Sequence, residues 1–272
     1  MEANYQGMRQ RPVSIVVSER IKVPVASLPP MLAKKLNDRL VFTNPEYEFR
    51  QSRGEWLGNV PPQIHCLYEQ RGSYFIPRGF LTQLLELCQH FKVKYRLIDR
   101  QRTIDPVDFQ FHGVLKDYQE LAFKEIISRD QGTLVGDAKS GKTVIALYLI
   151  AQRRQPTMIV VPNVALLGHW KEKLVRFLEV PPDEVGLVGE GKFDIGPRVS
   201  VAHVSALYRR VRDIRARIGL LVVDECHRTP SRTFTQVVSH FDCRYLLGLS
   251  STSQRRDRLS RLIYYYVGDI LH

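Results

Sequence analysis

From Val114 to the C-terminus, short continuous apolar runs alternate with longer amphipathic stretches. The apolar runs occupy residues 132–136, 157–162, 198–204, 219–225 and 244–250. Between most of them apolar side chains recur at helical spacing, as in residues 142–154 and 165–178. Continuous apolar strands that alternate with helices are typical of a parallel sheet covered on both faces. The pattern therefore predicts an α/β domain over residues 106–272.

The first part of the chain has shorter and more mixed elements. We expect strands at residues 12–17 and 92–99, helices at 28–40 and 77–91, and a hairpin over 63–77 that turns at Arg71 and Gly72. Residues 103–113 contain a proline and show little periodicity, which indicates a connector. Residues 1–105 are therefore predicted to form a small α+β domain.

The composition is that of a globular protein, with 44% hydrophobic and 25% charged residues. No apolar run approaches the ~18 residues of a membrane-spanning helix, and the N-terminal residues lack the apolar stretch of a secretory signal. The four cysteines are scattered without a C-x-x-C pair, which argues against a disulfide framework or a zinc site. We therefore expect a cytoplasmic protein with no membrane partner.

The net charge of the chain is +12, and the basic surplus is shared by both parts of the sequence. Such a balance favours a polyanionic partner, most simply nucleic acid, because lysine and arginine that neutralise phosphates release counterions. On charge alone, a basic protein without such a partner stays an alternative.

Residues 136–143 have the G-x-x-x-x-G-K-T pattern of a phosphate-binding loop, between an apolar strand and a helix. The two glycines of this pattern let backbone N–H groups approach phosphate oxygens, and the N-terminus of the next helix adds partial positive charge. The lysine is expected to reach the β- and γ-phosphates and the threonine hydroxyl to bind Mg²⁺, so the predicted cofactors are ATP and Mg²⁺. The predicted cofactor-binding residues of the loop are Gly136, Ser140, Gly141, Lys142 and Thr143.

A second apolar strand pattern, at residues 220–223, ends at the carboxylates of Asp224 and Glu225. Open parallel sheets bind their ligands at the C-terminal ends of the strands. Asp224 is expected to hold Mg²⁺, and Glu225 to orient or deprotonate the attacking water. Such a pair alone is most often a solvated strand end, but the upstream phosphate loop favours the catalytic interpretation.

Taken in order, the motifs from Leu115 to the C-terminus resemble the first RecA-like lobe of a superfamily 2 helicase. Residues 224–227 resemble its D-E-x-H box, and residues 115–122 resemble its adenine-side motif. Residues 248–271 resemble the S-A-T-P segment and tail of the branch that contains XPB-like repair helicases and restriction-type translocases. The resemblance implies a DNA-dependent ATPase that works as a helicase or translocase, with DNA favoured over RNA as its partner. The small domain at residues 1–105 more weakly resembles an accessory, DNA-contacting region.

The resemblance also implies roles for individual residues. The implied catalytic residues are Lys142, Asp224, Glu225 and His227. Gln119 would read adenine with Tyr118 beside it, and Ser250 and Thr252 would link the ATP site to nucleic-acid binding. The candidate nucleic-acid contacts are Pro162, Asn163, His203, Arg209 and Arg210. A solvated helix face is the competing interpretation of the arginine run that begins at Arg209.

Several positions depart from the family pattern. Lys139 replaces an inner glycine of the phosphate loop, where a left-handed backbone would be strained. Asp137 brings a carboxylate near the phosphates, and Lys139 is placed to neutralise it. Ser251 and Ser253 stand where the family has alanine and proline. None of these changes removes an expected phosphate, magnesium or water ligand.

Two questions stay open at the level of sequence. Superfamily 2 motors close two RecA-like lobes around ATP, and the second lobe is absent from these 272 residues. Either the chain is a fragment of a longer protein or a separate polypeptide supplies the second lobe. The chain could instead be a half-motor or an assembly subunit that does not hydrolyse ATP alone. Residues 45–56 interleave aromatic and basic side chains, which is typical either of base stacking or, more often, of a domain core.

Overall fold

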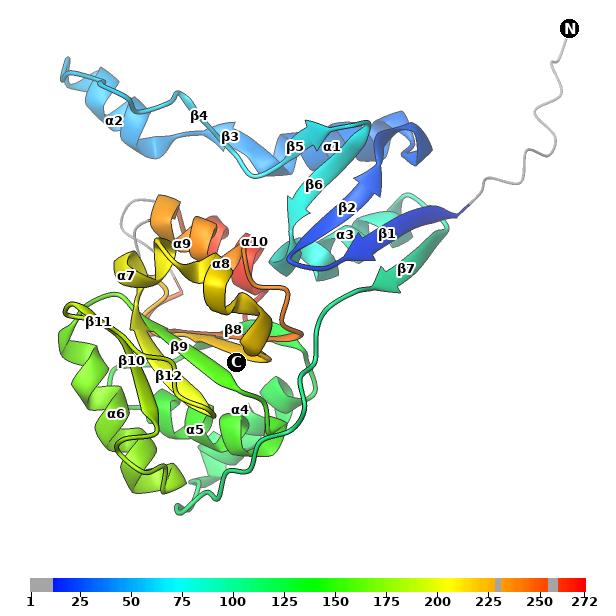
Figure 1. The fold of residues 1–272 in the computed structure, drawn as a ribbon. Helices are drawn as coiled ribbons and strands as arrows, with labels where there is room; N and C mark the ends of the chain where they lie inside the picture. Colours follow the sequence, from blue (N-terminus) through cyan, green and yellow to red (C-terminus); the bar gives the residue numbers. More distant parts are fainter. Residues whose placement is uncertain (1–11, 228–230, 254–258) are drawn as a thin grey trace, which may run out of the picture.

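The computed structural model describes residues 12–227, 231–253 and 259–272. Two sheets organise these residues, one in each part of the chain (Figure 1). The first has five strands in the order β5-β6-β2-β1-β7, and the second has seven in the order β11-β10-β12-β9-β13-β14-β8. A separate two-stranded pair, β3-β4, carries helix α2 away from the first sheet.

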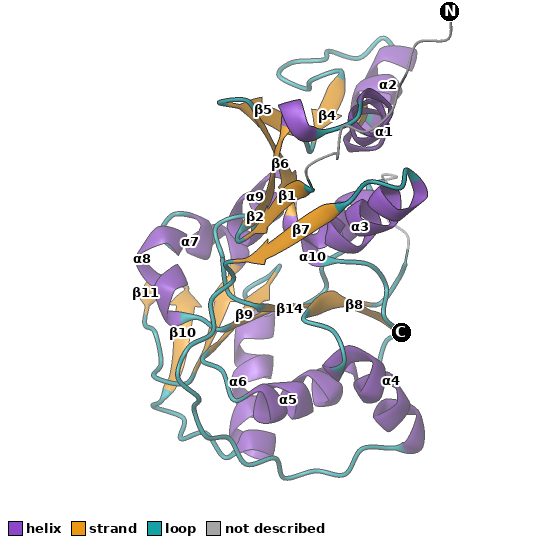
Figure 2. Ribbon diagram, turned by 90° about the vertical axis from the view of Figure 1, so that its right-hand side faces the viewer, coloured by secondary structure: helices purple, strands orange, loops and turns teal. Residues whose placement is uncertain are grey.

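Helices α1 and α3 of the first part pack on one face of the five-stranded sheet (Figure 2). Alternate residues of β1 are buried, and they form one core with the leucines that α1 presents at every fourth position. Pro30 begins α1, where its missing N–H costs nothing. The strands of this part are β1 (Val13–Val17), β2 (Arg20–Pro24), β3 (Val41–Thr43), β4 (Gln63–His65), β5 (Tyr68–Gln70), β6 (Ser73–Pro77) and β7 (Tyr95–Asp99). The helices are α1 (Pro30–Leu40), α2 (Pro45–Ser52) and α3 (Leu81–His90).

The seven-stranded sheet is parallel except for its edge strand β11. Helices α4, α5 and α6 lie on one face and α7, α8, α9 and α10 on the other (Figure 2), and each face has its own apolar core. The strands are β8 (Gln131–Val135), β9 (Thr157–Val161), β10 (Val185–Gly189), β11 (Lys192–Phe193), β12 (Val199–His203), β13 (Leu220–Val223) and β14 (Tyr245–Ser250). The helices are α4 (Asp117–Ile127), α5 (Lys142–Arg153), α6 (Ala165–Leu178), α7 (Val204–Tyr208), α8 (Val211–Ile214), α9 (Ser231–Val238) and α10 (Ser260–Val267).

Helix α10 joins the two parts of the molecule. Leu262 and Tyr265 of this helix belong to the core of the first part, whereas Ile263 and Val267 belong to the core of the second. The ring of Tyr265 meets Phe80 edge to face, with centroids 5.2 Å apart. The five-stranded sheet is therefore attached directly to the last helix of the larger domain.

The predicted fold class, a RecA-like parallel sheet preceded by a small α+β domain, is confirmed. The five predicted strands of the second part form as β8, β9, β12, β13 and β14, and the hairpin turns at Arg71 and Gly72 as expected. The elements that were not individually predicted are strands β2, β3, β10 and β11 and helices α2, α4, α7, α8, α9 and α10. The proposed boundary at residue 105 stays a prediction.

The core interpretation of the aromatic segment 45–56 is wrong for two of its rings. Trp56 is 84% exposed, and Phe49, which belongs to α2, is 56% exposed. The arm formed by β3, β4 and α2 extends away from the five-stranded sheet (Figure 1). Asn44 explains the local fold, because its side chain accepts the N–H of Glu46 and so caps a helix that opens with a proline. Helix α2 buries no residue, so its formation depends on this cap rather than on packing.

Candidate functional site

The predicted site residues follow five neighbouring strands of one sheet. His203 ends β12, Pro162 follows β9, Asp224 follows β13, Ser250 ends β14 and Gly136 follows β8. These strands are adjacent in the order β12-β9-β13-β14-β8 and all run parallel. Their C-terminal ends therefore meet at one edge of the sheet, where open α/β sheets bind ligands.

The phosphate loop has a left-handed residue immediately before α5. Gly141 has φ of 86° and is the N-cap of this helix. A Cβ at this position would lie 2.0 Å from Nε2 of Gln119, so glycine is required both by the backbone and by the space above it. Lys142 is buried, and its Nζ donates to the carbonyls of Gly136 at 2.6 Å and Asp137 at 2.8 Å. The lysine is thus held over the loop that precedes it.

The departures within the loop have distinct outcomes. Lys139 has φ of 68°, so a lysine occupies the left-handed conformation that the sequence predicted to be strained without glycine. Asp137 and Lys139 are both exposed. The expected neutralisation of Asp137 is wrong, because no ion pair joins the two side chains within the described part of the chain. Both charged side chains are therefore exposed to solvent.

The adenine-side residues lie against the phosphate loop. The hydroxyl of Tyr118 donates to the carbonyl of Ser140 at 3.0 Å, and Nε2 of Gln119 points to the same carbonyl at 3.4 Å. Oε1 of Gln119 accepts the backbone N–H of Lys116, which starts helix α4. Because an amide has two N–H bonds and two oxygen lone pairs, one donor and one acceptor site of Gln119 remain for a ligand.

Asp224 is held by a tryptophan to which the sequence assigned no role. Nε1 of Trp170, on α6, donates to Asp224 Oδ2 at 2.7 Å, and the backbone N–H of Glu225 donates to Oδ1 at 2.9 Å. Burial raises the pKa of Asp224, while the indole, the backbone N–H and the nearby Lys142 ammonium each lower it. The carboxylate is therefore fixed in direction and close enough to the phosphate-loop lysine to feel its charge.

The carboxylate of Asp224 and the hydroxyl of Thr143 supply hard oxygen donors, which Mg²⁺ prefers in proteins. Thr143 is half-buried at the first turn of α5, next to Lys142. The donor set and the glycine-lined loop fit a magnesium-bound nucleoside phosphate. Within the described residues no cluster of three or more His, Cys, Asp or Glu side chains could hold a metal ion by itself.

The turn after β13 is tied to the end of β14. Nδ1 of His227 lies 3.0 Å from Ser250 Oγ and 3.3 Å from a carboxylate oxygen of Glu225. The Ser250 hydroxyl donates to the carbonyl of Thr252 at 2.5 Å. With its hydrogen engaged there, the Ser250 oxygen can accept a hydrogen bond from His227 in the tautomer that carries its proton on Nδ1. Glu225 has φ of 45°, so its backbone is in the left-handed region that non-glycine residues rarely occupy.

Ser251, which stands where the family has alanine, adds a contact to the same group. Its hydroxyl lies 3.2 Å from Glu225 Oε2 and 3.3 Å from His227 Nε2. The side chain therefore touches two of the predicted catalytic residues from the end of the neighbouring parallel strand, β14. Serine in place of the family's alanine therefore adds a hydroxyl group to the site.

The candidate nucleic-acid contacts lie beside this group along the edge of the sheet. Pro162 and Asn163 connect β9 to α6, and Asn163 Oδ1 accepts the N–H of Leu166 at 3.2 Å. His203 precedes α7, and Arg209 and Arg210 lie exposed between α7 and α8. The guanidinium of Arg210 lies 3.7 Å from the centre of the Phe193 ring and pairs with Asp213, so it is partly engaged within the protein.

Trp170 was missed because the sequence signal for its role is indirect. It lies among the buried residues of α6, where periodicity predicts a core position. A buried indole N–H usually finds a partner, but its partner here is 54 residues away in the chain. Only the adjacency of β9 and β13 brings the two residues together.

Comparison with known proteins agrees with this geometry. A family model described as "Type III restriction enzyme, res subunit" matches residues 112–255, more than half of the chain. The chain belongs to this family. The match begins close to the adenine-side motif and includes the phosphate loop, the D-E-x-H box and the loop after β14.

Relatives in this family are named as helicases and translocases. DNA 3'-5' translocase XPB2 of Sulfurisphaera tokodaii is 32% identical over 158 residues, which are 58% of this chain and 35% of that protein. Probable helicase D10 of Escherichia phage T5 is 29% identical over 176 residues, 64% of this chain and 38% of that protein. The chain thus spans little more than a third of the length of these two relatives. The assignment to superfamily 2 helicases, with the first RecA-like lobe, is confirmed.

Among solved structures, the UvsW helicase from bacteriophage T4 has the same fold. The two chains align with a TM-score of 0.70 over 96% of this chain and 99% of that chain, at 16% sequence identity. At this identity the likeness establishes the fold alone. No helix in the described ranges is both long and apolar enough to cross a membrane.

Proposed function

We propose that the chain is the ATP-binding motor lobe of a DNA-dependent helicase or translocase. The observation that carries the proposal is the convergence of the phosphate loop, the Asp224–Glu225 turn and the Ser250 strand end at one edge of the seven-stranded sheet. The family match and the named relatives support it, since those relatives are described as helicases and translocases.

In this proposal the loop residues bind the phosphates of ATP. Backbone N–H groups at the start of α5 would donate to phosphate oxygens. The ammonium of Lys142, which now donates to the carbonyl of Gly136, would donate to the β- and γ-phosphates instead. Thr143 and Asp224 would hold Mg²⁺, which when bound neutralises phosphate charge. Trp170 fixes the direction of the Asp224 carboxylate throughout.

Glu225 is proposed to hold the attacking water and accept its proton. Its carboxylate already contacts the His227 ring and the Ser251 hydroxyl, which orient it. Gln119 is proposed to read adenine through the donor and acceptor sites that the protein leaves unused. The exposed loop residues Asn163 and Arg209 would contact the DNA backbone, with phosphate contacts setting position rather than sequence preference.

Hydrolysis by such motors needs an arginine finger, which is worth roughly 10³–10⁵ in rate. The described residues build one RecA-like sheet, so we propose that a second lobe supplies this arginine, either elsewhere in a longer protein or in a separate polypeptide. A half-motor that binds ATP and DNA but does not turn over alone is the second candidate. The observation that favours this candidate is the single RecA-like sheet in the described residues.

The test is steady-state ATP hydrolysis and fluorescent-nucleotide binding by this chain, with and without single-stranded DNA. Lys142→Ala removes the buried phosphate ligand, and Lys139→Ala is the matched control because that lysine lies in the same loop but is exposed. We expect nucleotide binding that is lost in Lys142→Ala and kept in Lys139→Ala.

The outcomes separate the candidates. DNA-stimulated turnover that is lost in Lys142→Ala supports a complete site, formed by self-association. Nucleotide binding without turnover supports the half-motor, and addition of the partner lobe should then restore the rate. A wild-type chain that binds no nucleotide in the presence of Mg²⁺ would refute the proposed function.

A further inference from the structure

A groove outside the nucleotide site runs between α1 and α3, on the helical face of the five-stranded sheet. Its volume is about 670 Å³, within the range of about 300–1,000 Å³ that is usual for ligand sites. The residues that face the gap are Met31, Lys35 and Arg39 from α1 and Leu87, His90 and Phe91 from the end of α3. The function derived above uses none of them.

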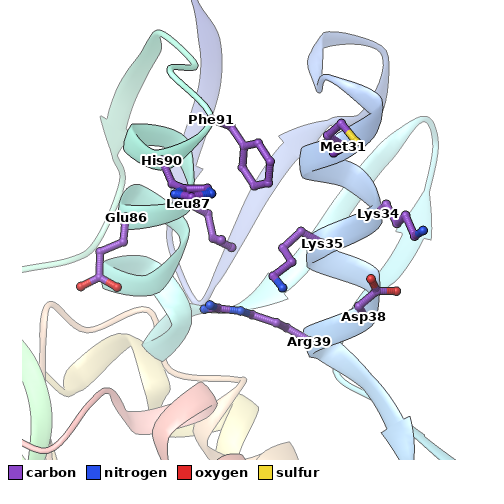
Figure 3. A pocket seen from close by; sticks show the side chains of 9 residues that line it. All are labelled: Met31, Lys34, Lys35, Asp38, Arg39, Glu86, Leu87, His90 and Phe91. Carbon is purple, nitrogen blue, oxygen red and sulfur yellow. The ribbon is translucent and has the colours of Figure 1, made fainter.

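The charged side chains around the groove point in different directions (Figure 3). Lys35 and Arg39 extend from α1 toward α3, into the space between the helices. The carboxylates of Asp38 and Glu86, which also border the groove, point away from that space. The centre of the groove is therefore positively charged although its outer margins are mixed.

The two central cations are available to a ligand. In the described ranges neither Lys35 nor Arg39 takes part in an ion pair. Phe91 is half-buried and directs its ring into the gap, and the His90 ring meets it edge to face with centroids 5.0 Å apart. Leu87 adds an apolar surface beneath. The groove thus combines phosphate-binding cations with a flat aromatic surface.

The wall of this groove is fixed to the motor lobe. The hydroxyl of Tyr265, on α10, donates to the backbone carbonyl of Arg39 at 3.0 Å. Tyr265 is buried in the core of the first part of the chain, next to Phe80. A ligand held by α1 would therefore be connected through one hydrogen bond to the last helix of the ATP-binding domain.

We propose that this groove binds a segment of single-stranded DNA, with phosphates on Lys35 and Arg39 and a base against Phe91. Cations that follow a backbone, combined with aromatic rings that stack bases, are the features of sequence-independent single-strand sites. The flat ring favours a base over an acidic protein segment, which would need cations but no stacking surface. The assignment of DNA as the ligand rests on the proposed function.

The test measures binding of fluorescently labelled oligo(dT) to the whole chain by anisotropy over a range of salt concentrations, without nucleotide. In the double variant Lys35→Ala, Arg39→Gln, the loss of two phosphate contacts should reduce the slope of log K against log salt by about 1.4. Phe91→Leu keeps an apolar side chain but removes the stacking surface, and it should weaken binding about 5-fold or more.

Lys34→Ala is the matched control, because Lys34 lies on the same helix but points away from the gap (Figure 3). It should change the salt slope by less than half as much as the double variant. Thermal melting by circular dichroism checks that all variants fold, and nucleotide binding should be unchanged in each. Photocrosslinking with bromodeoxyuridine oligonucleotides should label the peptide that contains Phe91.

The outcomes distinguish this proposal from the proposed function. DNA binding and salt slope that are unchanged in the double variant would overturn the groove assignment and leave the motor function standing. The assignment would also be overturned, in favour of an acidic protein partner, if the chain bound poly-glutamate and neither competing oligonucleotide nor the Phe91→Leu substitution weakened that binding. A wild-type chain that binds nucleotide but no single-stranded DNA at low salt would overturn both the groove and the DNA dependence of the motor.

Discussion

The substitution Trp170→Phe removes one N–H from a buried carboxylate while it keeps an aromatic ring on α6. The indole donates to Asp224 over 2.7 Å, Trp170 is fully buried, and Asp224 is only 8% exposed. A hydrogen bond to a charged group contributes about 1.5–3 kcal/mol, and a buried acceptor that loses its donor costs about 1–3 kcal/mol. We therefore expect the free energy of unfolding to fall by about 2 kcal/mol or more, measured by urea denaturation with circular dichroism.

A double-mutant cycle with Asp224→Ala, which leaves the indole no side-chain acceptor at this position, separates the hydrogen bond from the smaller ring. The cavity left by phenylalanine is present in both backgrounds and cancels, so the remaining coupling reports the contact between indole and carboxylate. We expect a coupling of about 1.5–3 kcal/mol. A coupling below about 0.5 kcal/mol, the usual limit for independent sites, would refute the claim that Trp170 holds Asp224.

The same variant should depend on pH in a defined direction. Burial raises the folded-state pKa of Asp224, so this residue favours folding while it is protonated, and that contribution is lost as the pH rises through the folded pKa. The indole N–H opposes the effect of burial, so its removal raises the folded pKa further. The stability lost in Trp170→Phe should be largest above the folded pKa and should shrink as the pH falls below it. A loss that is independent of pH would show that packing alone is responsible.

Three further substitutions and one chemical probe test the loop and the core. Lys139→Gly should raise the free energy of unfolding by up to about 1 kcal/mol, because glycine adopts the left-handed backbone of this position without strain. Lys139→Ala should not raise it. Equal free energies of unfolding for the two variants in urea denaturation would show that the lysine backbone is not strained. Gly141→Ala should cost at least about 1–2 kcal/mol and abolish fluorescent-nucleotide binding, while Gly136→Ala, whose φ is not positive, should cost less. Ser251→Ala should lower the steady-state rate with an unchanged KM for ATP, since it loosens the Glu225 carboxylate; an unchanged rate would leave Ser251 without a role. Burial raises the pKa of all four thiols, so native protein at neutral pH should react slowly with a thiol reagent and fully only after denaturation.

The elements that could be predicted from the sequence are those with a strong local pattern. Strands such as β9 and β13 are buried along their whole length, and the residues of the phosphate loop are consecutive. Helix α2 could have been predicted from its Asn44 cap and following proline, but it has no apolar face, so periodicity gave no signal. Strand β11 is only two residues long, too short for alternation to stand out. Strand β2 is as long as β1 and alternates buried with less buried residues, so it could have been predicted from the sequence.

The contacts that complete the candidate site could not be predicted, because they join residues far apart in the sequence. The motif pattern indicates that Asp224 matters but does not show which side chain directs it, and the donor lies on a helix packed behind a neighbouring strand. Exposure at Trp56 is also a tertiary outcome. The same alternation of aromatic and basic residues would suit a core if the β3-β4 arm lay against the sheet instead of extending from it.

The strand order places the two proposed ligands on opposite sides of one turn. The loops after β9 and β12, proposed to contact DNA, lie on one side of β13, and the phosphate loop after β8 lies on the other, beyond β14. Between them, His227 joins Glu225 to Ser250, whose carbonyl accepts the N–H of Gly136 at 3.1 Å. A shift of this turn therefore moves groups that face both ligands. Because coupling between two binding sites is reciprocal, any factor by which single-stranded DNA tightens ATP binding must equal the factor by which ATP tightens DNA binding. His227→Ala should reduce this common factor, and a variant that kept the wild-type factor would show that the connection runs elsewhere.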